Sequence, residues 1–397
     1  MSKRFGVVLC SLLLAACGGG GSDNSSSSSL RSSSSLALTS SNSSATVGIS
    51  SSQSSSFSSP HSSSSVASSS TSYPAGFALG ADISWVSEME ANGHKFYNAQ
   101  GDEKTAYELM ASLGLDAIRL RVWVNPEDGW YNSIQDVVAK AKLAKAQGQR
   151  IMINFHYSDN WADPGKQTKP VLWQDYPFEQ LKIALADHTR ASLIALRDAG
   201  ITPEWVQVGN ETNDGFLWDS ARPSVEPTAA NMKNYAELTT AGYDATKEIF
   251  PEALVIVHLA NCHDNENFRW IFDGLTVNNA KFDVIGASSY PTYSDDTSWQ
   301  VITQQCADNL NDMVVRYQKP VILAEMGVPW DHAEGRTIIA DLIAKVALIK
   351  DGKGLGAFYW EPQAYNWKSY SLGAFDLNGK PTDIMNAFSD AAALISE

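Results

Sequence analysis

The feature that most constrains the fold starts at Phe77, where short β-branched apolar runs begin to alternate with longer amphipathic stretches. This alternation predicts repeated βα units and a parallel sheet. Helices are predicted at residues 133–147, 178–199, 228–250 and 335–349, and strands at residues 77–83, 117–122, 151–155, 205–208, 253–257, 284–287, 321–324 and 356–359. Eight strands is the number in a (β/α)8 TIM barrel, so we expect an α/β fold of this class.

Composition divides the chain into two parts. Residues 18–72 are almost wholly Ser, Gly, Ala and Thr, and hold too few large apolar side chains to bury a core. Residues 73–397 are about as long as a single α/β barrel domain. We therefore expect one barrel domain at 73–397, preceded by a flexible linker at 17–72. The formal net charge of −15 repels phosphate backbones, and we expect no nucleic-acid partner.

The N-terminus has the pattern of an export signal. Two basic residues precede an apolar run over residues 5–16, which is too short for a permanent membrane span. The run leads into the sequence LAAC, which resembles the lipobox of bacterial lipoproteins, in which the cysteine is lipidated. We expect a signal peptide at residues 1–16 and a lipid anchor at Cys17 as the only membrane contact. The alternative is an ordinary signal peptide with an incidental cysteine. Gly18, in place of Asp, favours the outer membrane or the cell surface.

Two cysteines, Cys262 and Cys306, belong to the folded part of the chain. An exported protein reaches an oxidising compartment, where a disulfide between them is the natural interpretation. Two separate buried thiols are the alternative.

Polar and aromatic residues gather where the predicted strands end. In a (β/α)8 barrel the carboxyl ends of all strands open on one face, and the active site is built there. Loops far apart in the sequence therefore converge on one cleft. The residues at these ends are Asp82, Ser84, Arg119, Arg121, His156, Asn210, Glu211, His258, Tyr290, Glu325, Trp360 and Glu361.

Two of these residues, Glu211 and Glu325, follow the fourth and seventh predicted strands. Hydrolysis of a glycosidic bond needs one carboxyl group that protonates the leaving oxygen and a second that attacks the anomeric carbon. In enzymes that retain the anomeric configuration, the two groups lie about 5–5.5 Å apart. Either glutamate alone could be a surface residue just past a strand, but the two positions together favour a glycoside hydrolase.

At this point a family resemblance becomes specific. Asn210-Glu211 and Glu325 resemble clan A of the glycoside hydrolases, whose (β/α)8 members are retaining. Further motifs, spread from about Gly76 to the C-terminus, resemble family 53, the endo-β-1,4-galactanases. They are the sequences GADIS at 80–84, RLRVWVNP at 119–126, WADP at 161–164 with its sequel KQTKP, and YWEP at 359–362.

The resemblance implies roles for individual residues. Glu211 would be the general acid/base and Glu325 the nucleophile. Asn210 would hold the sugar 2-hydroxyl, while Arg119 and Tyr290 would orient and ionise the nucleophile. The other expected substrate-binding residues are Trp360 as the floor of the subsite for the reacting sugar, and Asp82, Arg121, Trp123, His156, Trp161 and His258 around it.

The resemblance also implies a substrate, the β-1,4-galactan side chains of type I arabinogalactan or pectin. A polymer-cutting enzyme benefits from an open groove with several Trp, so we expect internal cleavage, and a monomer is the default for a tethered endo-enzyme. We expect no cofactor and no metal, because the loops after Glu325 and Trp360 lack the acidic run through which some bacterial relatives bind calcium. Three alternatives stay open: another clan A endo-β-1,4-glycanase (mannanase, cellulase or xylanase), a non-catalytic surface lipoprotein that binds glycans, and a metal hydrolase.

Overall fold

A computed structural model describes residues 76–293, 296–388 and 390. The predicted signal peptide at 1–16, the lipidation site at Cys17 and the linker at 17–72 lie outside the described residues. Residues 73–75, at the start of the predicted barrel domain, lie outside them as well.

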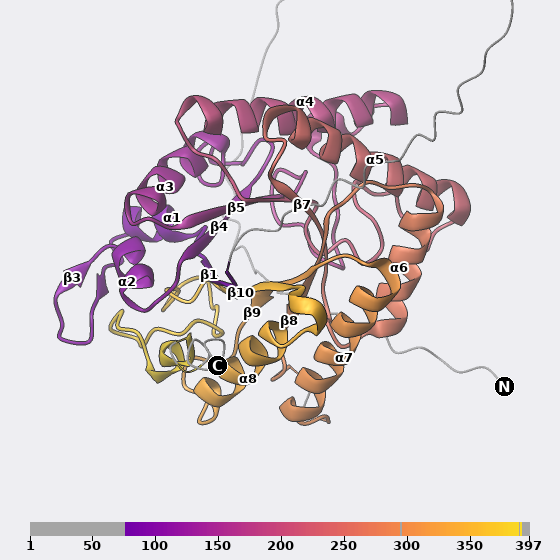
Figure 1. The fold of residues 1–397 in the computed structure, drawn as a ribbon. Helices are drawn as coiled ribbons and strands as arrows, with labels where there is room; N and C mark the ends of the chain where they lie inside the picture. The colour runs from indigo at the N-terminus through magenta and orange to yellow at the C-terminus, as the bar shows by residue number, and fades with distance from the viewer. Residues whose placement is uncertain (1–75, 294–295, 389, 391–397) are drawn as a thin grey trace, which may run out of the picture. The chain divides into compact units, whose positions relative to one another are not determined.

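The described chain forms the predicted barrel (Figure 1). Eight parallel strands close in the order β1-β10-β9-β8-β7-β6-β5-β4. Each lies within three residues of a predicted strand at either end. The strands are β1 (Ala78–Asp82), β4 (Ala117–Val122), β5 (Arg150–Phe155), β6 (Trp205–Val208), β7 (Leu254–Leu259), β8 (Val284–Ser289), β9 (Val321–Met326) and β10 (Gly354–Trp360). A small antiparallel hairpin, β2 (Phe96–Tyr97) and β3 (Glu103–Lys104), stands outside the barrel.

Helices surround the strands (Figure 1). All four named helix predictions are confirmed within about two residues. Ser133 caps the first of them by accepting the Asp136 amide, and Gly148 and Gly200 follow two of them with positive φ angles of 77° and 75°. The helices are α1 (Val86–Ala91), α2 (Ala106–Ser112), α3 (Ile134–Ala146), α4 (Phe178–Asp198), α5 (Thr228–Ile249), α6 (Asn265–Val277), α7 (Trp299–Tyr317) and α8 (Gly335–Ala347).

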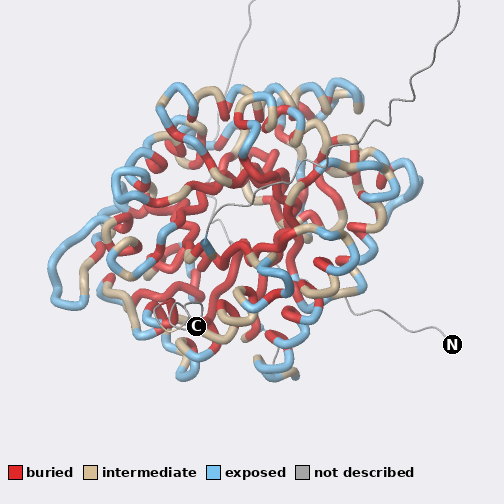
Figure 2. The backbone as a smooth tube through the Cα atoms, viewed as in Figure 1, coloured by how far each residue is buried: buried red, intermediate tan, exposed pale blue. Residues whose placement is uncertain are grey.

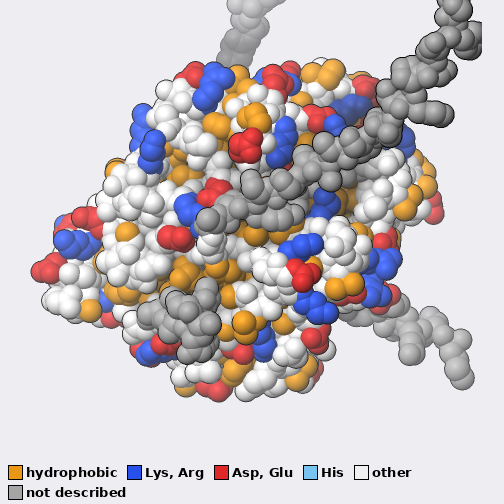
Figure 3. All heavy atoms as spheres, in the orientation of Figure 1, with side chains coloured by type: hydrophobic (Ala, Val, Ile, Leu, Met, Phe, Trp, Pro, Cys, Tyr) orange, Lys and Arg blue, Asp and Glu red, His pale blue; other side chains and the backbone are white. Residues whose placement is uncertain are grey.

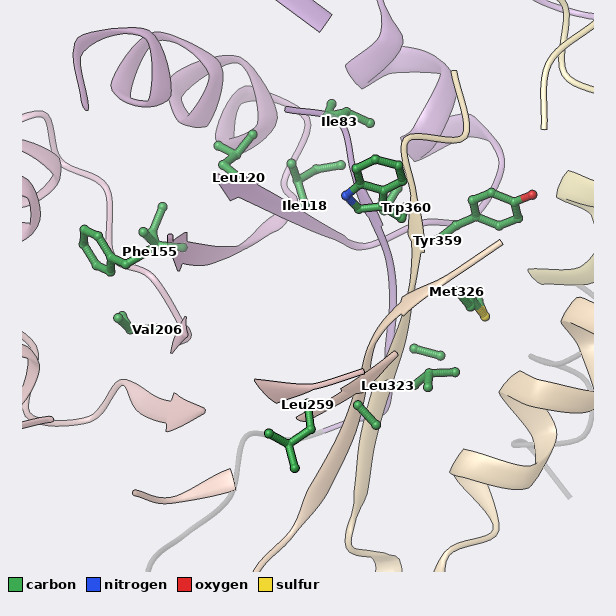
Figure 4. Close-up of a cluster of buried hydrophobic side chains, with 14 of the residues drawn as sticks. Ile83, Ile118, Leu120, Phe155, Val206, Leu259, Leu323, Met326, Tyr359 and Trp360 are labelled. Atoms are coloured by element: carbon green, nitrogen blue, oxygen red, sulfur yellow. The ribbon is translucent and has the colours of Figure 1, made fainter. Parts of the chain in front are cut away.

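Apolar side chains pack on both sides of the barrel wall. Figure 2 shows the strands as almost wholly buried and the outer helix surfaces as exposed. Figure 4 shows part of the layer between strands and helices, including Ile118, Phe155 and Val206. A second group, the barrel-floor cluster, fills the lumen; it consists of Ala78, Ala117, Met152, Trp205, Leu254, Ile256, Val284, Ile322, Leu355 and Phe358.

The inward-facing positions change from apolar to polar along each strand, because side chains two residues apart share a face. On β4, Ala117 is followed by Arg119 and Arg121, and on β6, Trp205 is followed by Gln207. All of these side chains are buried. Polar groups are therefore concentrated at the carboxyl ends of the strands, where the sequence predicted the site.

Two further features concern the surface and the export prediction. Figure 3 shows Lys and Arg side chains interspersed with Asp and Glu over the outer helices, and pairs such as Arg316–Asp273 join neighbouring helices. Among the described helices, none is long and apolar enough to cross a membrane.

The predicted disulfide is confirmed. Cys262, in the loop after β7, and Cys306, in α7, are bonded with their Cα atoms 4.8 Å apart, and both are buried. The bond fastens a loop at the carboxyl end of the barrel to an outer helix.

Candidate active site

Glu211 follows β6 in a tight turn. Gly209 and Glu211 both have positive φ angles, 84° and 47°. For a glutamate this left-handed conformation costs about 1–2 kcal/mol, so the surrounding contacts must hold it in place. Gln167 supplies such contacts, since its Nε2 donates to the carbonyl oxygens of Asn210 at 2.7 Å and Glu211 at 3.3 Å. The strained turn presents a half-buried carboxyl group to the cleft.

Glu325 lies near the end of β9, just past a register irregularity in its pairing with β8. Arg119 Nη1 lies 2.8 Å from Glu325 Oε1, and the Tyr290 hydroxyl donates to Glu325 Oε2 at 3.0 Å. Both contacts stabilise the ionised carboxylate. The structure thus places Arg119 and Tyr290 on the two oxygens of the predicted nucleophile.

The two glutamates face each other across the barrel mouth. A carboxylate oxygen of Glu211, one of Glu325 and a ring nitrogen of His258 all lie within 4.8 Å of one another. Burial raises the pKa of Glu211 to about 8, and the neighbouring charge of Glu325 adds to the rise. Burial also raises the pKa of Glu325, but Arg119 and Tyr290 oppose that rise. The arrangement therefore favours the proton on Glu211 and the negative charge on Glu325, which alone is paired with a cation.

Arg119 organises the layer below the two carboxylates. Its guanidinium is fully buried and donates to Asp82 Oδ2 at 2.8 Å, to Asn210 Oδ1 at 2.9 Å and to Gln207 Oε1 at 3.1 and 3.2 Å. Asn210 also donates through Nδ2 to the Ala162 carbonyl at 2.8 Å. The second Nδ2 hydrogen of Asn210 has no partner in the described part of the chain, so it is available to a sugar hydroxyl.

An aromatic group forms one wall of the site. The Trp360 ring lies 5.0 Å from Trp85, 5.8 Å from Trp161 and 4.9 Å from Tyr370, measured between centroids. Trp161 in turn lies 5.5 Å from Trp123. Trp123 and Trp161 are half-buried, so both retain surface for a sugar, whereas Trp360 is 8% exposed.

Several residues that we expected to bind substrate lie deeper than the sequence indicated. Four of them, Asp82, Arg119, Arg121 and His258, are 0% exposed. The Arg121 guanidinium lies 4.1 Å from the centroid of Trp161 and 3.6 Å from Glu361.

His156 is also largely buried. Its Nδ1 accepts the Ala162 amide at 3.1 Å, and its ring centroid lies 6.0 Å from Trp161. His156 therefore belongs to the packing behind Trp161.

Sequence reasoning did not assign a role to Ser288 at the end of β8 or to Gln207. Ser288 Oγ donates to Glu211 Oε1 at 2.7 Å and contacts His258 Nε2, also at 2.7 Å. The rule that selected the other strand-end residues applies equally to Ser288. Gln207 lies deeper in the barrel than Ser288, and nothing in its sequence context distinguishes it from a surface glutamine.

Glu211, His258 and Glu325 are close enough to share a cation, but their contacts do not suit one. Both ring nitrogens of His258 are engaged within the protein, by Gln207 and by Ser288. Glu325 already pairs with Arg119. Because the protein itself supplies the positive charge, we assign no metal to this group.

A (β/α)8 barrel with two glutamates at the ends of its fourth and seventh strands, one with a raised pKa and the other paired with an arginine, defines a glycoside hydrolase that works with two carboxyl groups. Residues 78–338 match the sequence profile of glycosyl hydrolase family 53, and the chain belongs to that family.

Relatives named as galactanases support the assignment. The arabinogalactan endo-β-1,4-galactanase of Cellvibrio japonicus is 32% identical over 312 residues, covering 72% of this chain and 80% of that protein. The endo-β-1,4-galactanase of Bacillus subtilis is 30% identical, covering 72% and 70%. A solved structure from a study of two fungal β-1,4-galactanases superposes with a TM-score of 0.70 at 28% identity, covering 79% of this chain and 98% of that one.

Proposed function

We propose that this protein is an endo-β-1,4-galactanase that cleaves galactan side chains of type I arabinogalactan or pectin with retention of configuration. The observation that carries the proposal is the unequal environment of two close glutamates. Glu325 is paired with Arg119, whereas Glu211 forms no ion pair with any described residue and accepts from Ser288. This inequality separates the acid from the nucleophile.

In the first step, a carboxylate oxygen of Glu325 bonds to the anomeric carbon as the glycosidic C–O bond breaks. The proton of Glu211 passes to the departing oxygen, which leaves as a hydroxyl. In the second step, Glu211, now ionised, takes a proton from water, and the water oxygen bonds to the anomeric carbon. The ester bond to Glu325 breaks, and both carboxyl groups return to their starting states.

The substrate class follows from the family and from the relatives, two of which are named endo-β-1,4-galactanases. Galactan and β-1,4-glucan differ in the orientation of the C4 hydroxyl, which changes the path of the chain. The wall formed by Trp123, Trp161 and Trp360 suits the flat apolar face of a sugar ring. Stacking on several aromatic side chains favours binding within a polymer, and hence internal cleavage.

The direct test is release of reducing ends from galactan, mannan, xylan and carboxymethylcellulose by the full chain. Glu325→Ala is the inactive control, and Glu252→Ala, which removes an exposed glutamate outside the cleft, is the matched control. We expect release from galactan alone, lost in Glu325→Ala and retained in Glu252→Ala. Release from another polymer alone would reassign the specificity within clan A, and no release from any would favour a glycan-binding lipoprotein.

We also propose that the enzyme is exported and acts as a monomer tethered to the outer membrane or cell surface through a lipid on Cys17. The basic start, the apolar run at 5–16 and the small residues before Cys17 support this location. Metabolic labelling with palmitate should mark the protein, and Cys17→Ala should remove the label. Label that persists in Cys17→Ala would contradict the anchor.

A further inference from the structure

In each hydrogen bond beneath Glu211, it can be decided which atom donates and which accepts. Arg119 decides the first of these bonds. A guanidinium only donates. Because Arg119 Nε and Nη2 both reach the same side-chain atom of Gln207, that atom must be the amide oxygen, Oε1. The amide nitrogen of Gln207 is thereby turned the other way, toward His258 Nδ1 at 2.8 Å.

The orientation of Gln207 determines the tautomer of His258. Its Nδ1 faces two donors, Gln207 Nε2 and, at 3.4 Å, the Glu211 backbone amide. Nδ1 therefore carries no proton. Burial lowers the pKa of His258 well below 6.5, and Arg119 adds to this, so the ring is neutral and its single proton is on Nε2.

The tautomer in turn orients Ser288. His258 Nε2 lies 2.7 Å from Ser288 Oγ and donates to it. The hydroxyl proton of Ser288 is then free to point only at its other neighbour, Glu211 Oε1, at 2.7 Å. Four hydrogen bonds in sequence thus connect Arg119, which contacts Glu325, to the carboxyl group of Glu211.

We propose that Gln207, His258 and Ser288 form a one-way relay that keeps Glu211 Oε1 an acceptor, so that the proton delivered to the leaving group is carried by Glu211 Oε2. The proposal rests on the acid/base role proposed above for Glu211. Among the described residues none donates a hydrogen bond to Oε2, and the half-buried side chain of Glu211 faces the cleft, so Oε2 is the oxygen left for the substrate. Ser288, His258 and Gln207 are accordingly positioning residues.

The groups that act on the Glu211 carboxyl come from five elements: Arg119 from β4, Asp163 from the loop after β5, His258 from β7, Tyr290 after β8 and Glu325 from β9. Asp163 and Glu325 favour the protonated acid, whereas Arg119 favours the charged form. His258 is neutral, and burial keeps Tyr290 protonated by raising its pKa well above 10. Ser288 donates a hydrogen bond to the Glu211 carboxyl and is itself uncharged.

The first test reads the tautomer directly. In the 15N-labelled full chain, the chemical shifts of the two ring nitrogens of His258, assigned by their loss in His258→Gln, distinguish a protonated from an unprotonated nitrogen. We expect Nε2 protonated and Nδ1 unprotonated throughout pH 6–9. A proton on Nδ1 would reverse every later bond of the relay and overturn the proposal.

The second test reads the titration of Glu211. In Ser288→Ala a hydrogen bond to the charged carboxylate is lost, so the basic limb of kcat/KM on galactan should move up by about one pH unit. Ser288→Thr, which keeps the hydroxyl, should restore it. Ser289→Ala is the matched control, because Ser289 Oγ on the same strand is buried without a partner among the described residues. A basic limb that stays in place in Ser288→Ala would overturn the relay.

A 13C-detected titration of the Glu211 carboxyl, assigned with Glu211→Gln, gives the same comparison without substrate. If the wild type does not hydrolyse galactan, the proposed function fails while this titration still decides the relay. A rise in Ser288→Ala that is absent in Ser289→Ala supports the relay, and equal titration in both variants contradicts it.

Discussion

Arg119 and Glu325 form an ion pair of 2.8 Å at the base of the cleft, and the arginine side of the pair is closed to solvent. The same guanidinium also bonds to Asp82, Asn210 and Gln207. A single side chain therefore positions both the nucleophile Glu325 and the residues beneath Glu211. This arrangement depends on the planar fork of arginine, which a lysine ammonium does not reproduce.

Arg119→Lys should therefore lower kcat on galactan by about 100-fold or more, because the charge is retained but its aligned donors are lost. Steady-state kinetics with thermal unfolding of the same samples would separate this effect from misfolding. Arg150→Lys, at the opposite end of the barrel, is the matched control, since Arg150 pairs with Glu204 away from the site. Wild-type kcat in Arg119→Lys would refute the role.

The two glutamates should respond differently to truncation. Glu325→Ala should abolish turnover of every substrate, because no nucleophile remains. Glu211→Ala should keep measurable activity on aryl galactobiosides with good leaving groups, where acid assistance matters less. Rates on galactan and on an activated aryl substrate, measured side by side, test the assignment. Equal, mild losses in the two variants on both substrates are incompatible with it.

Glu211 should weaken the fold as the pH rises. Its carboxyl has an ordinary pKa of 4.5 and a folded pKa of about 8, so between these values the folded state binds a proton that the unfolded state has released. Stability is therefore lost from about pH 4.5 upward. Glu211→Gln, which does not titrate, should be more stable than the wild type by about 1–3 kcal/mol at pH 7 and equal to it near pH 4.

Urea unfolding of both proteins at several pH values measures this difference. Glu252→Gln, at an exposed position, should show no such trend. If Glu211→Gln is less stable than the wild type at pH 7, then the uptake of a proton by Glu211 on folding does not lower the free energy of unfolding as expected.

Removal of the disulfide should lower the free energy of unfolding by about 2–4 kcal/mol, since the bond closes a long loop in the unfolded chain. Cys262→Ala with Cys306→Ala, compared with the wild type by urea unfolding, measures the effect. A reducing agent should bring the wild type down to the level of the double variant and leave the variant unchanged. Free thiols at both Cys262 and Cys306 in the denatured, unreduced wild type, located by peptide mapping after alkylation, would contradict the bond.

Chelation should leave activity and melting temperature unchanged. Within the described part of the chain, the side chains that come closest to a metal-binding set are Glu211, His258 and Glu325, and they are already bonded to Ser288, Gln207 and Arg119. Dialysis against EDTA, followed by kinetics and thermal unfolding, tests this. Activity lost on chelation and restored by zinc or calcium would reopen the metal hydrolase interpretation.

The sequence was sufficient for the barrel and for the strand-end residues, because each is a local pattern: an apolar run followed by a polar side chain. The sequence could not show how far below the cleft each of these side chains is buried. Asp82 and His258 follow the same pattern as Glu211, yet they lie beneath the cleft, since depth depends on how neighbouring strands are staggered. Gln207 was missed for the same reason, as its partners come from β4 and β7, which no local pattern relates to it.

The barrel-floor cluster has a consequence for engineering. The floor is built from residues in the lower part of the strands, whereas the chemistry is built from the last residues and the loops that follow. A designer can therefore graft the loops after β5 and β8 from another member of the clan without repacking the lumen, provided that Gln167 and Tyr290, which contact the two glutamates, are kept. The barrel-floor cluster then stays unchanged while the new loops alter which polysaccharide the enzyme prefers, and the paired glutamates keep their positions.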